Sequence, residues 1–167
     1  AFAGTVTTNT GTITISDANT TDIQATDIAT IDSAITGAIT VTNTIDINGS
    51  GADVAAAFTA IDTNTGNATA NVTGTDYTVA HLKTINDATT GAIVLAAPTA
   101  NLTGDVADVV AAFAGTVTTN TGTITISDAA TTDITATDIT TINTAISGAI
   151  TVSNAIDING SGSEVKA

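Results

Sequence analysis

The sequence predicts an α/β solenoid of about six coils, each containing a short helix and two short parallel β-strands. One observation is a long internal repeat: residues 1–56 match residues 112–167 at 45 of 56 positions, so the same structure should occur twice along the chain. Another is a weaker motif, a helical apolar pattern followed by two β-like segments, that recurs every 27–29 residues. The third is an aromatic content of only 2%, which leaves Ile, Val, Leu and Ala to build a thin core. Such a core suits stacked coils that cover one another.

The weaker motif gives the coil boundaries. Coils begin near Ala25, Ala52, Val79, Ala107, Ala136 and Ser163. The predicted coils are therefore 25–51, 52–78, 79–106, 107–135 and 136–162, with 163–167 continuing into a 1–24 equivalent of the next unit. Joining residues 163–167 to residue 1 reproduces the pattern of residues 107–122. We expect a single uncapped segment, 1–167, that stacks end to end with copies of itself, either covalently or as separate subunits.

A helix is predicted at the start of each coil by apolar residues at helical spacing, such as Ile28, Ile31 and Ile35. Acidic residues fall in the first turns, where the helix dipole favours them. Glycines follow the apolar pattern and are expected to end the helices in the left-handed conformation: Gly37, Gly66, Gly91, Gly122 and Gly148.

Two strands are predicted between successive helices. The first alternates Ile, Val or Leu with Thr, as in Ile13/Ile15, Ile39/Val41, Ile93/Leu95, Ile124/Ile126 and Ile150/Val152, while Ala68 and Ala70 make it weaker in the third coil. The second contains Ile23, Ile45/Ile47, Val72, Leu102, Ile134 and Ile156/Ile158. We expect two parallel ladders along the whole stack. Strands advance by ~4.8 Å per coil and helices need ~8–10 Å, so the stack should curve or supercoil. An all-β solenoid is the alternative.

Acidic and amide residues of the second strand form a candidate calcium site. If the Ile residues face inward, one outward column contains Asp22, Asp46, Asn71, Asn101, Asp133 and Asp157. The loop over residues 46–53, repeated at 157–164, adds alternating oxygen ligands, turn glycines and a late acid, as calcium loops do. The candidate metal ligands are Asp22, Asp46, Asn48, Asp53, Asp133, Asp157, Asn159 and Glu164. The alternative is that the same residue types form Asx-turns and helix caps.

Outward threonines of the first strand predict a row of hydroxyl groups, at Thr12/Thr14, Thr40/Thr42, Thr69, Thr123/Thr125 and Thr151. Ice-binding solenoids present similar arrays, but Val94 and Ala96 interrupt the row, and threonine is also favoured in strands for its own shape. His81, the single histidine, occupies the helix position that holds Asp27 and Asp138 in related coils. No serine has a repeated histidine partner and no glycine-rich phosphate loop follows a strand, so we do not expect an enzyme.

The charge and hydropathy of the chain limit its partners. Sixteen Asp and Glu against two Lys and Arg give a net charge of −14, which disfavours nucleic acid and anionic membrane surfaces. No apolar run approaches the ~20 residues of a membrane-spanning helix. The absence of cysteine excludes disulfides and thiolate chemistry.

The segments ATDIATIDSAITGAITV (25–41) and VAHLKTINDATTGAIVL (79–95) resemble the Ala/Thr/Asp-rich tandem repeats of giant cell-surface proteins of marine cyanobacteria and related bacteria. This resemblance covers every coil. It implies an extracellular location, a very long polypeptide and a role in surface layers, adhesion or motility, with no catalytic residues to carry over. We expect a structural repeat of an extracellular filament, surface layer or adhesin shaft. A ligand-binding or ice-binding solenoid surface is the alternative.

Overall fold

The computed structural model describes residues 10–166, in which two strands and then a helix follow one another six times. The helices are α1 (Ala25–Ala34), α2 (Gly51–Ala60), α3 (Val79–Ala88), α4 (Val106–Ala112), α5 (Ala136–Ala145) and α6 (Gly162–Lys166). The strands are β1 (Ile13–Ile15), β2 (Asp22–Gln24), β3 (Ile39–Val41), β4 (Asp46–Gly49), β5 (Thr63–Asn64), β6 (Thr69–Val72), β7 (Ile93–Leu95), β8 (Leu102–Gly104), β9 (Ile124–Ile126), β10 (Asp133–Thr135), β11 (Ile150–Val152) and β12 (Asp157–Asn159). This order confirms the predicted α/β class, and the all-β alternative is wrong. The predicted junction between residue 167 and residue 1 lies outside the described residues.

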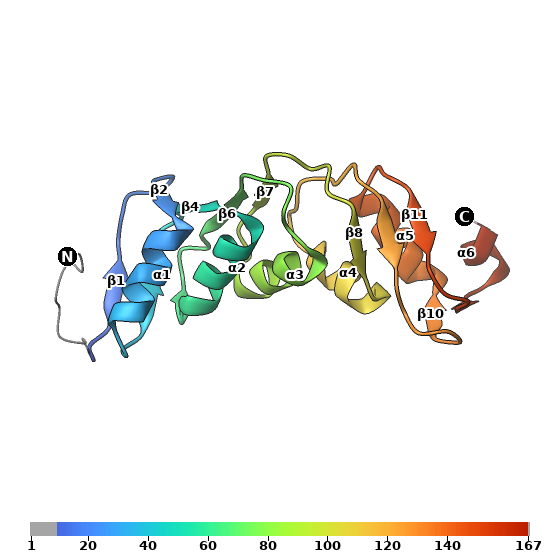
Figure 1. Ribbon diagram of the computed structural model, residues 1–167, viewed down its shortest axis with the longest axis horizontal. Helices are drawn as coiled ribbons and strands as arrows, with labels where there is room; N and C mark the ends of the chain where they lie inside the picture. The colour runs from blue at the N-terminus through green and yellow to red at the C-terminus, as the bar shows by residue number, and fades with distance from the viewer. Residues whose placement is uncertain (1–9, 167) are drawn as a thin grey trace.

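The six repeated units lie one after another along an elongated molecule (Figure 1). Each helix contacts the next one in the chain, from α1 through α6. β1 and α6 lie at opposite ends of the long axis (Figure 1). Within the described range, no helix is both long enough and apolar enough to cross a membrane.

Every paired strand in residues 10–166 runs parallel to its partner. Equivalent residues face each other, as Ile13 faces Ile39 in β1 and β3, and Ile124 faces Ile150 in β9 and β11. Within each sheet the inward residues of paired strands therefore form rows that consist mostly of aliphatic side chains. This parallel pairing between coils was predicted.

The strands do not form the two continuous ladders that the sequence predicted. They form four small sheets, with the orders β1-β3-β5, β2-β4-β6-β7, β8-β9-β11 and β10-β12. β7, expected in the first ladder, pairs with β6, and β8, expected in the second, pairs with β9. Residues Ala68 and Ala70 do not mark a first strand either, because Ala70 lies in β6 opposite Ile47 of β4.

A difference between the spacing of paired strands and the spacing of the helices explains why the two continuous ladders do not form. Asp22 faces Asp46, which faces Thr69, so the partners lie 24 and 23 positions apart. The helices α1, α2 and α3 begin at residues 25, 51 and 79, which are 26 and 28 positions apart. As a result β2 ends directly before α1, whereas β6 ends six residues short of α3. The strands pair in the register that places inward apolar residues opposite each other, such as Ala70 opposite Ile93 and Val72 opposite Leu95. Each such pairing shifts the position of the strands relative to the helices.

One apolar core runs through all the units and consists mostly of Ile, Val, Leu and Ala. Phe58, Phe113 and Tyr77 are its aromatic members. Inward residues of both strands and of the helices contribute, such as Ile39, Ile47 and Val54, none of which has any exposed surface. The predicted use of Ile, Val, Leu and Ala for most of the core is therefore confirmed.

The glycines after the helices have a different role from the one predicted. In none of the five does the backbone enter the left-handed region, and the capping residues Ile35, Ile61, Thr89 and Ile146 are extended. Instead, a Cβ atom at each of these glycines would collide with the backbone of the preceding coil, as at Gly148 against Gly122. Glycine is needed there because two backbones pass in close contact. The predicted helix ends are confirmed near Gly37, Gly91 and Gly148, whereas α2 ends at Ala60 and α4 at Ala112, well before Gly66 and Gly122. The predicted left-handed conformation is wrong at all five glycines.

The internal repeat allows a matched test of the core. Ile47 is fully buried, whereas its repeat counterpart Ile158 in β12 is 45% exposed. We expect Ile47→Ala to lower the free energy of unfolding by about 2–5 kcal/mol through lost burial and a cavity. Ile158→Ala should lower it by less than about 1 kcal/mol. Urea denaturation of both variants at low protein concentration measures the difference, and equal losses would contradict the observed packing.

Candidate functional site

The structure brings together two pairs of the predicted acidic column. Asp22 faces Asp46 between β2 and β4, and Asp133 faces Asp157 between β10 and β12. Asn71 does not continue the column, because it faces Asn48 instead of Asp46. Asn101 lies outside the strands and its side-chain oxygen accepts the backbone N–H of Thr123 at 2.9 Å. The column is therefore two separate carboxylate pairs, far apart in the chain.

Asn48 joins three strands through its side-chain amide. Its Nδ2 donates to Asp22 Oδ1 at 2.9 Å, and its Oδ1 accepts from Asn71 Nδ2 at 2.5 Å. In the second copy Asn159 Nδ2 donates to Asp133 Oδ1 at 3.1 Å, so the first of these bonds is repeated. These bonds offset the repulsion between facing carboxylates by giving one of them a donor. Asn48 is buried, and both ends of its amide make hydrogen bonds. Calcium binding by Asn48 and by Asp53 stays a prediction.

Asp53 and Glu164, the late acids of the two loops, take part in helix caps. Ser50 Oγ accepts the backbone N–H of Asp53 at 3.1 Å and donates to Asp53 Oδ2 at 2.7 Å, at the start of α2. At the start of α6 the Ser161 backbone N–H donates to Glu164 Oε2 at 2.7 Å, as in a capping box. Hydrogen bonds from the Ser161 side chain and then from its backbone lower the pKa of Glu164 below its ordinary value.

These contacts support the capping alternative for the loops. Among the described residues, no three His, Asp or Glu side chains gather in a group suited to a metal ion. Asn48 Oδ1 and Asp53 Oδ2 each accept one internal hydrogen bond, as the capping alternative expects. Calcium binding at Asp22, Asp46, Asp133, Asp157, Asn159 and Glu164 stays a prediction.

The predicted threonine row exists as two shorter rows. Thr14, Thr40 and Thr63 face one another in β1, β3 and β5. Thr103, Thr125 and Thr151 do so in β8, β9 and β11, where Thr125 Oγ1 and Thr151 Oγ1 lie 3.0 Å apart. Val94 is in another sheet, opposite Asn71, so the row is divided by the change of strand partners and not by Val94 and Ala96.

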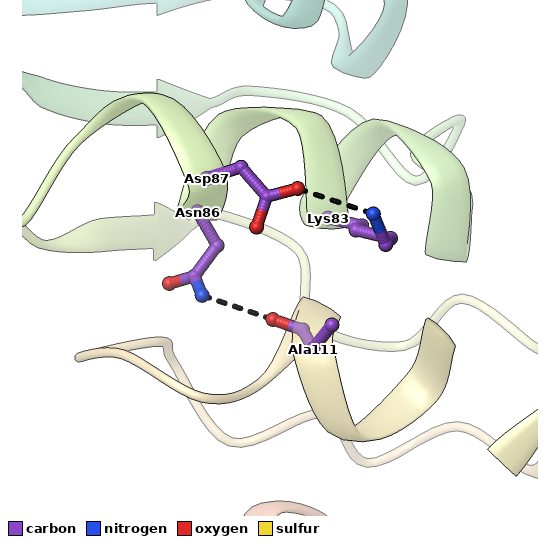
Figure 2. Close-up of polar contacts among 4 residues, drawn as sticks. All are labelled: Lys83, Asn86, Asp87 and Ala111. Carbon is purple, nitrogen blue, oxygen red and sulfur yellow. Dashed lines mark hydrogen bonds and ion pairs between the residues drawn. The ribbon is translucent and has the colours of Figure 1, made fainter. Parts of the chain in front are cut away.

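His81, the single histidine, and Lys83, one of the two lysines of the chain, both lie on α3. The backbone N–H of His81 is capped by Thr78 Oγ1 at 3.2 Å, while its ring Nδ1 is buried with no hydrogen-bond partner. Figure 2 shows that Lys83 pairs with Asp87 one turn further along the helix, with Lys83 Nζ 3.1 Å from Asp87 Oδ2. From the same helix, Asn86 Nδ2 donates to the carbonyl oxygen of Ala111 at 2.9 Å, which ties α3 to α4 (Figure 2). The first two contacts lie within α3 and its cap, and the Asn86–Ala111 bond joins two units. None of them joins His81 to a nucleophile.

Sequence reasoning missed a buried polar contact at the centre of the chain. The Tyr77 hydroxyl donates to Asn120 Oδ1 at 2.8 Å and accepts the backbone N–H of Ala100 at 3.3 Å. Asn120 has no exposed surface, and its Nδ2 donates to the Ala100 carbonyl at 3.0 Å. Burial raises the pKa of Tyr77, while the bond with Ala100 acts in the opposite direction. The only feature of the sequence that could have pointed to this contact is that Tyr77 is the single tyrosine of the chain.

The sequence also did not predict how far the apolar side chains of the last unit are exposed. Val152, Ile158 and Val165 are 44%, 45% and 54% exposed. Their counterparts in the internal repeat, Val41, Ile47 and Val54, have no exposed surface. The same three residue types therefore form a buried layer in the first copy and an open apolar face in the second. We call this set, Val152, Ile158 and Val165, the C-terminal face.

The cap at α6 gives a pH-dependent prediction. Because the folded-state pKa of Glu164 is lowered, its ionised carboxylate stabilises the fold above its ordinary pKa, and this contribution is lost as the pH falls through the lowered value. In an NMR titration, the Glu164 carboxyl should titrate below the usual range for glutamate, and Ser161→Ala should move it back upward. Ser147→Ala, at an exposed serine away from this cap, should leave it unchanged. A Glu164 titration that ignores Ser161→Ala would contradict the assigned contacts.

The choice between caps and calcium gives another prediction. Excess EDTA should leave the melting temperature unchanged, and Ser50→Ala should lower the free energy of unfolding by about 1 kcal/mol through loss of the cap. Thermal melting followed by circular dichroism, with and without millimolar calcium, measures the first effect. A melting temperature that falls in EDTA and recovers with calcium would establish the calcium site instead.

No model of a known protein family, no curated protein and no solved structure matches this chain.

Proposed function

We propose that the chain is a structural repeat of a long extracellular filament, surface layer or adhesin shaft, built as a curved α/β solenoid that stacks end to end with identical units. The observation that carries this proposal is the repetition of one strand–strand–helix unit six times along the described residues, with each helix in contact with the next. Units that bury their apolar residues against their neighbours are typical of repeat proteins that form long arrays.

The repetition of elements supports the stacking role. Six units in the same order contact their neighbours in sequence, and their buried residues belong to one apolar core. Such a chain is stabilised by the burial of apolar residues between successive units. Additional units therefore lengthen the molecule without changing its cross-section. This is the mechanical property that a shaft or coat needs.

The surface chemistry supports an extracellular structural role over catalysis or nucleic-acid binding. The net charge of −14 repels polyanions, and the polar groups near His81 tie helices together. The resemblance to bacterial cell-surface repeats points to the same location. The proposal assigns the chain no reaction and no membrane span.

A ligand-binding or ice-binding surface is a second candidate, favoured by the threonine rows. Each row holds three threonines on three adjacent strands, and Thr125 and Thr151 already bond to each other. Two short rows on separate sheets offer a smaller regular lattice than one continuous row. Measurable thermal hysteresis by the purified chain would favour this candidate.

Immunogold electron microscopy of the cells that produce the chain tests the structural proposal. An antibody against the exposed loop at residues 128–131 should label fibres or a coat outside the cell, with gold particles repeating at a regular axial distance. Pre-immune serum is the control. Label confined to the cell interior, or to compact particles with no axial repeat, would overturn the proposal.

A further inference from the structure

We propose that the groove between α4 and β10 binds an extended, basic peptide segment of another protein, which adds as a strand to the free edge of β10. The groove lies inside the described part of the chain, with units before and after it, and so does not depend on where the sequence begins or ends. Binding a partner in this way goes beyond the structural role proposed above.

The free edge of β10 results from the change of strand partners in the middle of the chain. β4 lies between β2 and β6, so both of its edges are paired, whereas β10 pairs only with β12. The strand expected on the other side of β10 is β8, which precedes α4 along the chain, but β8 pairs with β9 instead. Within the described residues, one edge of β10 therefore has no strand partner.

The backbone of β10 presents hydrogen-bonding groups to this edge. The carbonyl oxygen of Thr132 accepts the N–H of Asp157 at 3.0 Å, so Thr132 and Ile134 direct their backbone groups toward β12. Because the backbone groups of successive residues in a strand point to opposite sides, Asp133 and Thr135 direct theirs toward the free edge. An edge of this kind is a template for an added strand.

A groove of about 510 Å³ lies along the free edge. Residues 132–135 line one side of it, and Val106, Ala107 and Val110 of α4 line the other. Ile134 and Val106 are only 5% and 4% exposed, which gives the groove an apolar floor. The open space is therefore located where a strand partner of β10 would lie, and apolar side chains of that partner would have a surface to pack against.

Three carboxylates favour a basic partner. Asp128, Asp133 and Asp138 all line the groove. The hydrogen bonds that these carboxylates accept come from uncharged groups, and the only ion pair within residues 10–166 joins Lys83 and Asp87 on α3. The charge of the groove is thus not neutralised by the described part of the chain, and a lysine or arginine side chain supplies the complementary charge.

The alternation of side chains along β10 predicts the pattern of the partner. Ile134 is buried, whereas Asp133 and Thr135 on either side of it are exposed. A strand beside β10 should therefore alternate apolar residues, next to Ile134, with lysine or arginine, next to Asp133. This chain has only two Lys and Arg residues and contains no such segment, so the partner is a different protein.

Fluorescence anisotropy with labelled synthetic peptides tests the groove. The probe is a blocked six-residue peptide that alternates lysine and valine, and the control peptide contains three lysines followed by three valines. The alternating peptide should bind about fivefold more tightly or better, because only it can place valine on the apolar floor and lysine beside Asp133 at the same time. Equal binding of the two peptides would indicate attraction between net charges alone and would overturn the inference.

A pair of charge variants tests whether the attraction is local. Asp133→Asn should weaken binding of the alternating peptide about two- to fivefold, because it removes the charge beside the free edge. Asp108→Asn is the matched control, since Asp108 is an exposed acid of α4 that does not line the groove. Its affinity should equal that of the unmodified chain, and equal weakening by both variants would count against the groove.

A pair of backbone variants tests strand addition. Thr135→Pro and Thr135→Ala both lose the hydroxyl that caps α5, but only Thr135→Pro also loses the N–H at the free edge. Thr135→Pro should bind the alternating peptide about fivefold more weakly than Thr135→Ala, as expected for one lost hydrogen bond. Circular dichroism checks that both variants fold, and equal affinities would exclude strand addition.

Hydrogen exchange followed by NMR tests the same contact without a substitution. In the unmodified chain, saturating alternating peptide should slow the exchange of the Thr135 N–H, because a strand partner shields it from water. Unchanged exchange, or no binding at millimolar peptide, would overturn the inference. Neither result would bear on extracellular fibres labelled by immunogold, so the structural proposal and the binding groove can fail separately.

Discussion

The structure depends on one constraint: a single coil of this chain cannot bury its own apolar residues. Each unit contributes two strands of two to four residues and one helix of five to ten residues, too little to enclose a core. Val41, Ile47 and Val54 become fully buried because the next unit lies over them. Burial is therefore a property of neighbouring pairs of units, and the ends of any run of units must expose what the middle hides.

The sequence was informative wherever structure is decided locally. The predicted coil starts lie within one residue of the first residue of every helix, because spaced apolar residues such as Ile28 and Leu82 mark a helical face. Eleven of the twelve strands contain at least one apolar residue that the sequence placed in a strand, the exception being the two-residue β5. Parallel pairing followed from the repetition itself.

What the sequence could not provide is the partner of each strand. Ile-Thr-Ile segments satisfy the inward–outward alternation in several registers, so composition alone does not choose between them. From the first unit to the third, the strand spacing falls short of the helix spacing by two and then five positions. β7 and β8 consequently lie in sheets where they were not expected. The same limit applies to the candidate site. From the sequence alone, Asp53 is as compatible with calcium binding as with a helix cap, and only its contacts with Ser50 favour the cap.

The bond between Tyr77 and Asn120 has a consequence for how the chain reaches its native state. Segments such as 13–15 and 124–126 are identical, so a folding chain can pair them with the wrong partner at almost no energetic penalty and become trapped. Tyr77 has no duplicate, and its hydroxyl meets Asn120, 43 positions away, at a point where both are buried. Misaligned chains would leave these polar groups unsatisfied inside the protein. We therefore expect the hydrogen bond of this unrepeated side chain to favour the native pairing of strands over pairings between the wrong repeats.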